Sequence, residues 1–194
     1  MKRFYRPIGI LLCLLLLSTA CSQTHEFGGA VYEEPQTVPD FTLAAANEQT
    51  VSLSDFRGQY VFIYFGYTFC PDLCPDTLAK LARVHKQLGD EAGQMQVVMI
   101  SVDPERDTPE KLAEYVAAFD DSFVGLTGSP TEIDAAGAAF GLYYEKHEGT
   151  AATGYLIDHT ARTYLLDPNG RILVAYPYDA TDDAIEADLR YLLD

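Results

Sequence analysis

The chain has 194 residues, of which 48% are hydrophobic, and its formal net charge is −16 at pH 7. This length and apolar content suffice for one domain with a full hydrophobic core. Phosphate backbones are bound by clusters of Lys and Arg, so we expect no nucleic-acid partner for a chain with 13 basic and 29 acidic residues.

The N-terminus predicts an export signal. Basic residues precede an apolar stretch at residues 8–17, which is too short to span a bilayer, since a spanning helix takes about 20 residues. Small residues then lead into Cys21, which resembles the lipobox of bacterial lipoproteins. We therefore expect a lipoprotein signal peptide at residues 1–20 and a lipid on Cys21 that holds the protein on the outer face of the cytoplasmic membrane, in a bacterial cell envelope. The alternative is an ordinary cleaved signal with an incidental cysteine.

Residues 21–37 are polar and have no sustained apolar period, which predicts a flexible tether from the lipidated Cys21. The pattern becomes globular after this point, and we expect the folded domain at residues 38–194. Its first elements are two short strands at residues 41–43 and 51–53, which flank a turn and predict a hairpin. A continuous aromatic and β-branched run at residues 60–65 then predicts a strand buried on both faces.

The remaining elements alternate between helices and strands. In chain order we expect a helix at 75–88, a strand at 94–102, a helix that starts after Thr108, a strand at 123–126, a helix at 130–140, a hairpin of strands 164–166 and 172–174, and a final helix at 181–193. This order predicts an α/β, thioredoxin-like fold, with a central, mostly parallel sheet, flanking helices and a C-terminal β-hairpin plus helix.

Cys70 and Cys74 are the only cysteines after Cys21, and one close pair is not the pattern of a disulfide scaffold. The pair follows the buried strand and opens a helix, where sites in open α/β sheets lie and where the helix N-terminus stabilises a thiolate. With three residues between them, the cysteines share one face of a helix. This spacing permits a disulfide and also allows both sulfurs to hold one soft metal ion.

A third ligand is expected from a histidine. His25 falls in the tether, His147 falls in a polar stretch, and His85 lies about 16 Å along the helix from Cys74. His159 immediately precedes the terminal hairpin, and in a thioredoxin fold the loop at this position faces the dithiol. We therefore expect His159 to be the ligand, although a histidine at a strand start is otherwise often only hydrogen-bonded.

Two thiolates and an imidazole suit copper, because soft sulfur selects Cu(I) and a nitrogen donor helps to accommodate Cu(II). The same donors also suit zinc with an open coordination position. The residues alone leave both metals open.

Three segments together resemble the Sco/SenC family of copper proteins, which act in cytochrome c oxidase assembly. They are Phe65–Pro75, which contains the cysteine pair, Ser101–Pro109, and Asp158-His159-Thr160. The resemblance implies that Cys70, Cys74 and His159 bind one copper ion per chain.

The family resemblance further implies that the client is the binuclear copper site of oxidase subunit II and that a separate copper donor protein supplies the metal. Asp158 is expected as an outer-shell residue, although an acid beside a histidine is often simply solvated. Asp103 and Asp107 are expected to shape the loop between a strand and a helix.

Two functions fit this site. The first is a metallochaperone, which is not an enzyme, and the second is a thiol–disulfide reductase that keeps the client cysteines reduced. Asp72 and Asp76 would oppose thiolate formation without a cation, which favours metal binding slightly. A peroxiredoxin-like peroxidase shares the fold, but such enzymes usually carry Thr or Ser three residues before the attacking cysteine, and here Tyr67 stands there.

Overall fold

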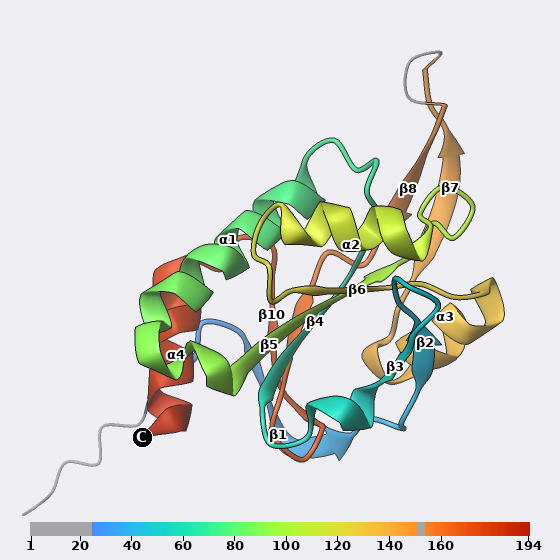
Figure 1. Ribbon diagram of the computed structural model, residues 1–194. Coiled ribbons are helices and arrows are strands. Elements are labelled where there is room, and N and C mark those ends of the chain that lie inside the picture. Colours follow the sequence, from blue (N-terminus) through green and yellow to red (C-terminus); the bar gives the residue numbers. More distant parts are fainter. Residues whose placement is uncertain (1–24, 151–153) are drawn as a thin grey trace, which may run out of the picture.

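The computed structural model describes residues 25–150 and 154–194 (Figure 1). A six-stranded sheet runs through the centre in the order β1-β10-β9-β4-β5-β6. Its strands are β1 (Ala30–Thr37), β4 (Tyr60–Gly66), β5 (Met95–Ser101), β6 (Val124–Leu126), β9 (Thr163–Leu166) and β10 (Arg171–Tyr176). The predicted α/β fold is confirmed. The β4–β5 and β5–β6 pairs are parallel, whereas the other three pairs are antiparallel because β9 and β1 run against the remaining strands.

The two central strands form the middle of the core. Every residue of β4 after Tyr60 is buried, and so is every residue of β5 except Gln96. The continuous apolar runs that predicted these strands are therefore explained by helices and loops that cover both faces of the sheet.

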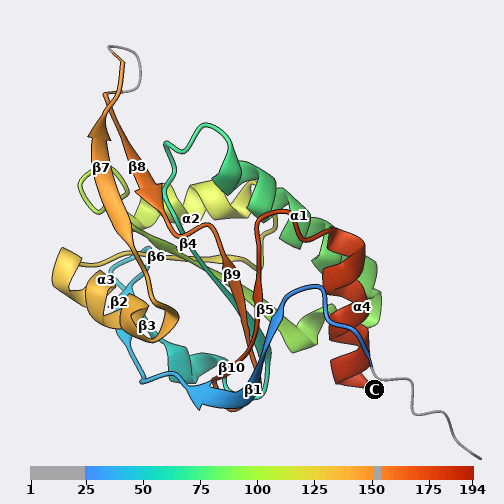
Figure 2. The same ribbon diagram turned by 180° about the vertical axis from the view of Figure 1, so that it is seen from behind.

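In the part of the chain that the structure describes, four α-helices surround the sheet, namely α1 (Leu73–Leu88), α2 (Pro109–Ala117), α3 (Pro130–Gly137) and α4 (Asp182–Leu193). Helix α1 packs beside α4, and α2 lies against β6 (Figures 1 and 2). The start of α2 is as predicted, since the Thr108 side chain accepts a hydrogen bond from the backbone N–H of Lys111. Helix α1 begins at Leu73, two residues before the predicted start, which places Cys74 in its first turn.

Short elements complete the chain. The strands β2 (Thr42–Ala44) and β3 (Thr50–Ser52) form the predicted hairpin, with Asn47 and Glu48 at positive φ in the turn. The β9–β10 hairpin at the C-terminal side is also confirmed. The described residues also form the 3₁₀ segments η1 (Leu53–Phe56), η2 (Gly89–Gln94) and η3 (Ala138–Phe140). The helix that was expected to continue to residue 140 ends at Gly137, and η3 follows it. Among the described residues, no helix is long and apolar enough to cross a membrane.

Residues 30–37, which were expected to belong to the flexible tether, instead form strand β1 and pair with β10 at the edge of the sheet. Most of their side chains are exposed, so they show no apolar period, and the strand is held by backbone hydrogen bonds. The register shifts between Val31 and Gln36, around Pro35, a residue that edge strands and bulges tolerate. The folded domain therefore starts upstream of residue 38.

The segment before β1 is also fixed to the domain. The Asp188 carboxylate on α4 accepts hydrogen bonds from His25 Nε2 at 2.6 Å and from the backbone N–H of Gly28 at 3.0 Å. The His25 ring stacks on Tyr191 with the ring centroids 4.3 Å apart. The expected signal peptide at residues 1–20 and the lipidated Cys21 lie outside the described residues, so their assignment stays a prediction.

A further hairpin was not predicted. Strands β7 (Tyr144–Glu148) and β8 (Tyr155–His159) pair with each other and project from the body of the domain (Figures 1 and 2). Most of their side chains are at least partly exposed, which explains why the segment read as a polar stretch. His159 is thus the last residue of a strand and not part of a loop.

Candidate metal centre

Three separate elements bring the donor atoms together. Cys70 lies in the loop after β4, Cys74 lies in the first turn of α1, and His159 ends β8. One ligand atom from each of the three lies within 4.8 Å of the other two. In the described part of the chain, this is the single group of three or more Cys, His, Asp or Glu residues arranged in this way.

The distances within the group are short. Cys74 Sγ lies 3.6 Å from His159 Nε2, and the backbone N–H of Cys74 donates to Cys70 Sγ at 3.4 Å. Both thiols are free. Two sulfurs and one imidazole nitrogen at one point form a donor set that suits a soft or borderline metal ion, so the residues present fit copper or zinc.

The two cysteines differ in burial and in acidity. Cys70 is half-buried, and a hydrogen bond from the Cys74 thiol lowers the pKa of Cys70 to about 4, with further hydrogen bonds from His159 and from the backbone. Cys74 is fully buried, and burial together with the nearby Cys70 raises the pKa of the Cys74 thiol. In the metal-free reduced pair, the thiolate is therefore on the accessible sulfur, where it can attack or receive an incoming group.

Residues of β4 and its end shape the wall behind Cys74. The buried Tyr64 hydroxyl donates a hydrogen bond to Cys74 Sγ at 3.3 Å. A Cβ atom on Gly66 would lie 2.9 Å from the same sulfur and 2.8 Å from the Tyr64 ring, so this position requires glycine. The apolar pattern of residues 60–65 indicated only a core position for Tyr64. A glycine at the end of a buried strand, next to the cysteine motif, was the available signal for a close approach.

The acidic loop after β5 supports the loop that carries Cys70. Buried Asp107 accepts hydrogen bonds from the backbone and hydroxyl of Thr68 and from the hydroxyl of Ser101. The expectation that Asp103 and Asp107 shape a loop is thus confirmed.

The same loop is joined to the β7–β8 hairpin. Tyr155 donates a hydrogen bond to Asp103 at 2.6 Å, and Arg106 donates one to the carbonyl of Tyr155 at 3.0 Å. Arg106 also forms an ion pair with Asp103. This network connects the strand that carries His159 to the segment before Cys70, a role that the sequence did not indicate.

The other predicted candidates lie elsewhere. Asp158 is exposed, and its carboxylate pairs with His147 Nε2 at 3.0 Å; no contact with the three donors supports its expected outer-shell role, which stays a prediction. His25 pairs with Asp188, and His85 pairs with Asp120 at 2.8 Å. None of these three histidines belongs to the donor group, as expected.

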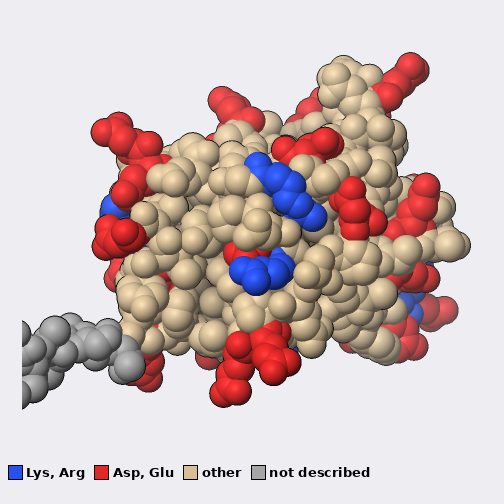
Figure 3. Space-filling model, turned by 90° about the horizontal axis from the view of Figure 1, so that it is seen from below, with Lys and Arg blue, Asp and Glu red and all other residues tan. Residues whose placement is uncertain are grey.

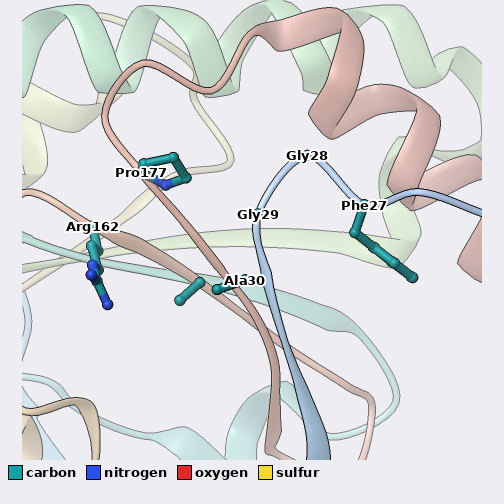
Figure 4. A pocket seen from close by; sticks show the side chains of 7 residues that line it. Phe27, Gly28, Gly29, Ala30, Arg162 and Pro177 are labelled. Atoms are coloured by element: carbon teal, nitrogen blue, oxygen red, sulfur yellow. The ribbon is translucent and has the colours of Figure 1, made fainter.

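Two cleft regions differ in their chemistry. The first lies at the donor group, between Cys70–Leu73 and Leu156–His159. The second lies beside the start of β1, and its labelled wall includes Phe27, Arg162 and Pro177 (Figure 4). The residues that line this second pocket include one charged side chain and no cysteine, histidine or carboxylate, so it offers no comparable ligand set.

The surface charge agrees with the composition. On the face shown in Figure 3, acidic side chains spread along the margins and basic side chains form only small groups. The described part of this face thus presents no continuous basic surface of the kind that phosphate backbones need.

Comparison with known proteins identifies related chains. A family model described as SCO1/SenC matches residues 30–194. The human mitochondrial SCO2 homolog is 39% identical over 153 residues, covering 78% of this chain and 58% of the human protein. The chain therefore spans less than two thirds of that relative's length. An SCO2-like protein of Rickettsia felis is 33% identical over 181 residues, covering 92% of this chain and 88% of the relative.

Solved structures with the same fold include three Sco proteins. The solution structure of apo Sco1 from Thermus thermophilus has a TM-score of 0.78 and 39% identity, and covers 88% of this chain and 99% of its own. ScoI of Bradyrhizobium japonicum with copper bound has a TM-score of 0.72 and 35% identity, with coverages of 80% and 98%. BsSco, described as a Sco family oxidase assembly protein with a disulfide switch, has a TM-score of 0.63 and 27% identity, with coverages of 82% and 95%.

Proposed function

Because the chain belongs to the SCO1/SenC family, we propose that it is a copper metallochaperone that binds one copper ion per chain through Cys70, Cys74 and His159. Its client is the binuclear copper site of cytochrome c oxidase subunit II. Copper binding by the Bradyrhizobium ScoI and the role of BsSco in oxidase assembly support this proposal by relationship.

The observation that carries the proposal is the convergence of two sulfurs and one imidazole within 4.8 Å, from three elements that are distant in sequence. In such a donor set the two sulfurs bind Cu(I), and the imidazole nitrogen allows Cu(II) to bind as well. It also accepts zinc. The relationship to a protein solved with copper favours copper as the cargo.

The burial of the two sulfurs suggests an order of events in transfer. Cys70 is half-buried at the mouth of the cleft, whereas Cys74 is enclosed. An incoming thiolate of the client or donor therefore meets the Cys70 side first, and Cys74 is the last sulfur to release the cargo. His159 Nε2 lies beside the Cys74 sulfur, at 3.6 Å.

Metal analysis tests the proposal directly. The reduced protein, exposed to equal amounts of copper and zinc and then freed of unbound metal, should retain one copper ion per chain. The Cys70→Ser and Cys74→Ser variants should lose it, and so should the protein oxidised to the Cys70–Cys74 disulfide, since thiolates are the ligands. Retention of copper by the oxidised protein, or preferential retention of zinc, would overturn the proposal.

The acidity of the two cysteines favours a second candidate function, a thiol–disulfide reductase. The Cys70 thiolate would attack a client disulfide and form a mixed disulfide, releasing one client thiolate. Cys74 would then lose its proton and attack the Cys70 sulfur, which releases the second client thiolate. The client gains two electrons, and this chain ends as the Cys70–Cys74 disulfide.

Rescue of a strain that lacks the protein separates the two functions. A reductase role predicts that an added thiol reductant restores oxidase activity and that added copper does not. A chaperone role predicts rescue by copper alone. A strain that carries the Cys70→Ser variant should behave like the deletion strain in both cases.

The partners and the cellular location follow from the same proposal. The copper donor is a separate protein, and the membrane is reached through a lipid on Cys21 in a bacterial cell envelope. The bacterial origin of the Rickettsia relative agrees with this location.

A further inference from the structure

Tyr64 is a buried polar residue that the proposed function does not use. It lies in the middle of β4 and has 0% of its surface exposed. Its hydroxyl donates to Cys74 Sγ at 3.3 Å. Its ring and the His159 ring form a T-shaped pair, with the ring centroids 6.1 Å apart. A phenol in such a place loses its hydration, so its hydrogen bond to sulfur is its main compensation.

The surroundings hold the phenol in this position. Gly66 leaves space for both the Tyr64 ring and Cys74 Sγ, because an added Cβ would come within 3 Å of each. On the other side, burial raises the pKa of Tyr64, and the Thr77 hydroxyl on α1 lies close enough to the Tyr64 oxygen to oppose part of this rise. The Tyr64 oxygen therefore lies between Thr77 and the buried sulfur. Cys70 has no comparable hydrogen bond from a phenol, since the groups that are hydrogen-bonded to its sulfur are Cys74, His159 and backbone groups.

We propose that Tyr64 is a positioning residue that holds the Cys74 sulfur and favours the reduced cysteine pair over the disulfide. Formation of the disulfide removes two electrons and the sulfur-bound protons and joins Cys70 Sγ to Cys74 Sγ, with a small disulfide such as oxidised dithiothreitol as the oxidant. The oxidant is reduced to its dithiol in the same exchange.

The direction of the effect follows from the acceptor strength of sulfur. In the reduced pair, Tyr64 donates to the Cys74 thiol, which itself donates to the Cys70 thiolate, so the charge on Cys70 strengthens the hydrogen bond from Tyr64. A disulfide sulfur carries no such charge and is a weaker acceptor. The Tyr64 bond therefore stabilises the reduced forms more than the oxidised form. It also fixes Cys74 where the sulfur faces His159, so the same bond keeps the donor group assembled. The inference deepens the proposed function and rests on it only for the use of the dithiol.

The experiment equilibrates the reduced, copper-free protein with buffers of reduced and oxidised dithiothreitol and measures the free thiols after acid quenching and alkylation. Loss of one hydrogen bond to the Cys74 sulfur should shift the equilibrium of Tyr64→Phe about fivefold towards the disulfide, which is about 20 mV for this two-electron couple.

The matched control is Tyr164→Phe. Tyr164 is also buried in the sheet, but its hydroxyl donates to the carbonyl of Phe140 at 2.6 Å and not to sulfur. Its dithiol equilibrium should stay within twofold of the unmodified protein. An unshifted Tyr64→Phe equilibrium, a shift towards the dithiol, or an equal shift in both variants would overturn the inference.

A second variant decides the matter if Tyr64→Phe does not fold. Thr77→Val removes the hydroxyl behind Tyr64 and keeps the shape of the side chain, so it should shift the equilibrium two- to threefold in the same direction. An unchanged equilibrium in this variant overturns the inference. Because no step uses copper, these results are independent of the metal analysis that tests the proposed function.

Discussion

The imidazole Nε2 of His159 lies 3.6 Å from the sulfur of Cys74, although the two residues are 85 positions apart in the chain. The contact joins the end of the projecting β7–β8 hairpin to the first turn of α1. The position of the hairpin therefore decides whether the third donor is present.

The His159→Ala variant tests this contact. Two thiolates are sufficient ligands for Cu(I), so the affinity of the variant for Cu(I) should fall only moderately. Cu(II) needs a harder donor, so the affinity for Cu(II) should fall far more. We expect the intense sulfur-to-Cu(II) absorption to be lost or short-lived, and the circular dichroism spectrum to be retained.

His147→Ala is the control for the same measurement. His147 lies on the same hairpin but pairs with Asp158, so its removal should leave the Cu(II) spectrum unchanged. An unchanged Cu(II) spectrum in His159→Ala, together with a changed spectrum in His147→Ala, would show that the ligand is His147 and not His159.

The pH dependence of alkylation reports the acidity of Cys70. Its pKa is lowered to about 4, so in the metal-free reduced protein the reactive thiolate should persist at pH 5 and disappear only as the pH falls through about 4. In Cys74→Ala, which lacks the thiol that donates to Cys70, the loss of reactivity should move to higher pH. Iodoacetamide labelling followed by mass spectrometry measures both, and a normal thiol profile for the unmodified protein would contradict the expectation.

Asp107 should be important for stability. Asp107→Ala leaves the Thr68 and Ser101 donors without their buried acceptor, which should lower the free energy of unfolding by about 3 kcal/mol. Urea unfolding measures the loss. The exposed Asp121 provides the control, since Asp121→Ala should change the unfolding free energy by less than about 0.5 kcal/mol. Equal effects of the two substitutions would argue against the loop network.

Asp188 should hold the N-terminal segment on the domain. Asp188→Ala removes the acceptor for His25, Gly28 and Tyr176, so residues 25–29 should become accessible to limited proteolysis and the midpoint of urea unfolding should fall. Glu186→Ala, on the same helix but partly exposed, is the comparison, and it should leave the cleavage pattern unchanged. Protection of residues 25–29 in Asp188→Ala would show that other contacts hold the segment.

The lipid anchor is tested by Cys21→Ser. Without the thiol, the protein should appear in the soluble envelope fraction or accumulate as an uncleaved precursor. Fractionation and mass spectrometry of the N-terminus distinguish these results from the unmodified protein. If Cys21→Ser stayed membrane-bound after normal cleavage, the lipobox interpretation would be wrong.

Most of the core architecture could be predicted from the sequence because its signals are local. The apolar runs of β4 and β5 are continuous since both faces of these strands are buried, and the Thr108-Pro109 pair marks the start of α2 through its own hydrogen bond. Cys70 and Cys74 are close in the chain, so their shared position at the end of β4 follows from spacing and from one strand–helix junction. The prediction of His159 as the third donor also required the expected fold, because Cys70 and Cys74 are distant from His159 in the sequence.

The edges of the molecule were decided by the tertiary structure. Strand β1 and the β7–β8 hairpin bury few side chains, so their residues carry little periodic signal, and their conformation comes from backbone pairing with a partner strand. The hydrogen bond from Tyr64 to Cys74 likewise has no sequence signature, because a tyrosine in a buried strand looks like any core aromatic. The sequence by itself determined the fold class and the candidate donors. Only the tertiary structure decided which polar groups meet the buried sulfur, because a hydrogen bond depends on positions in space that residue spacing does not specify.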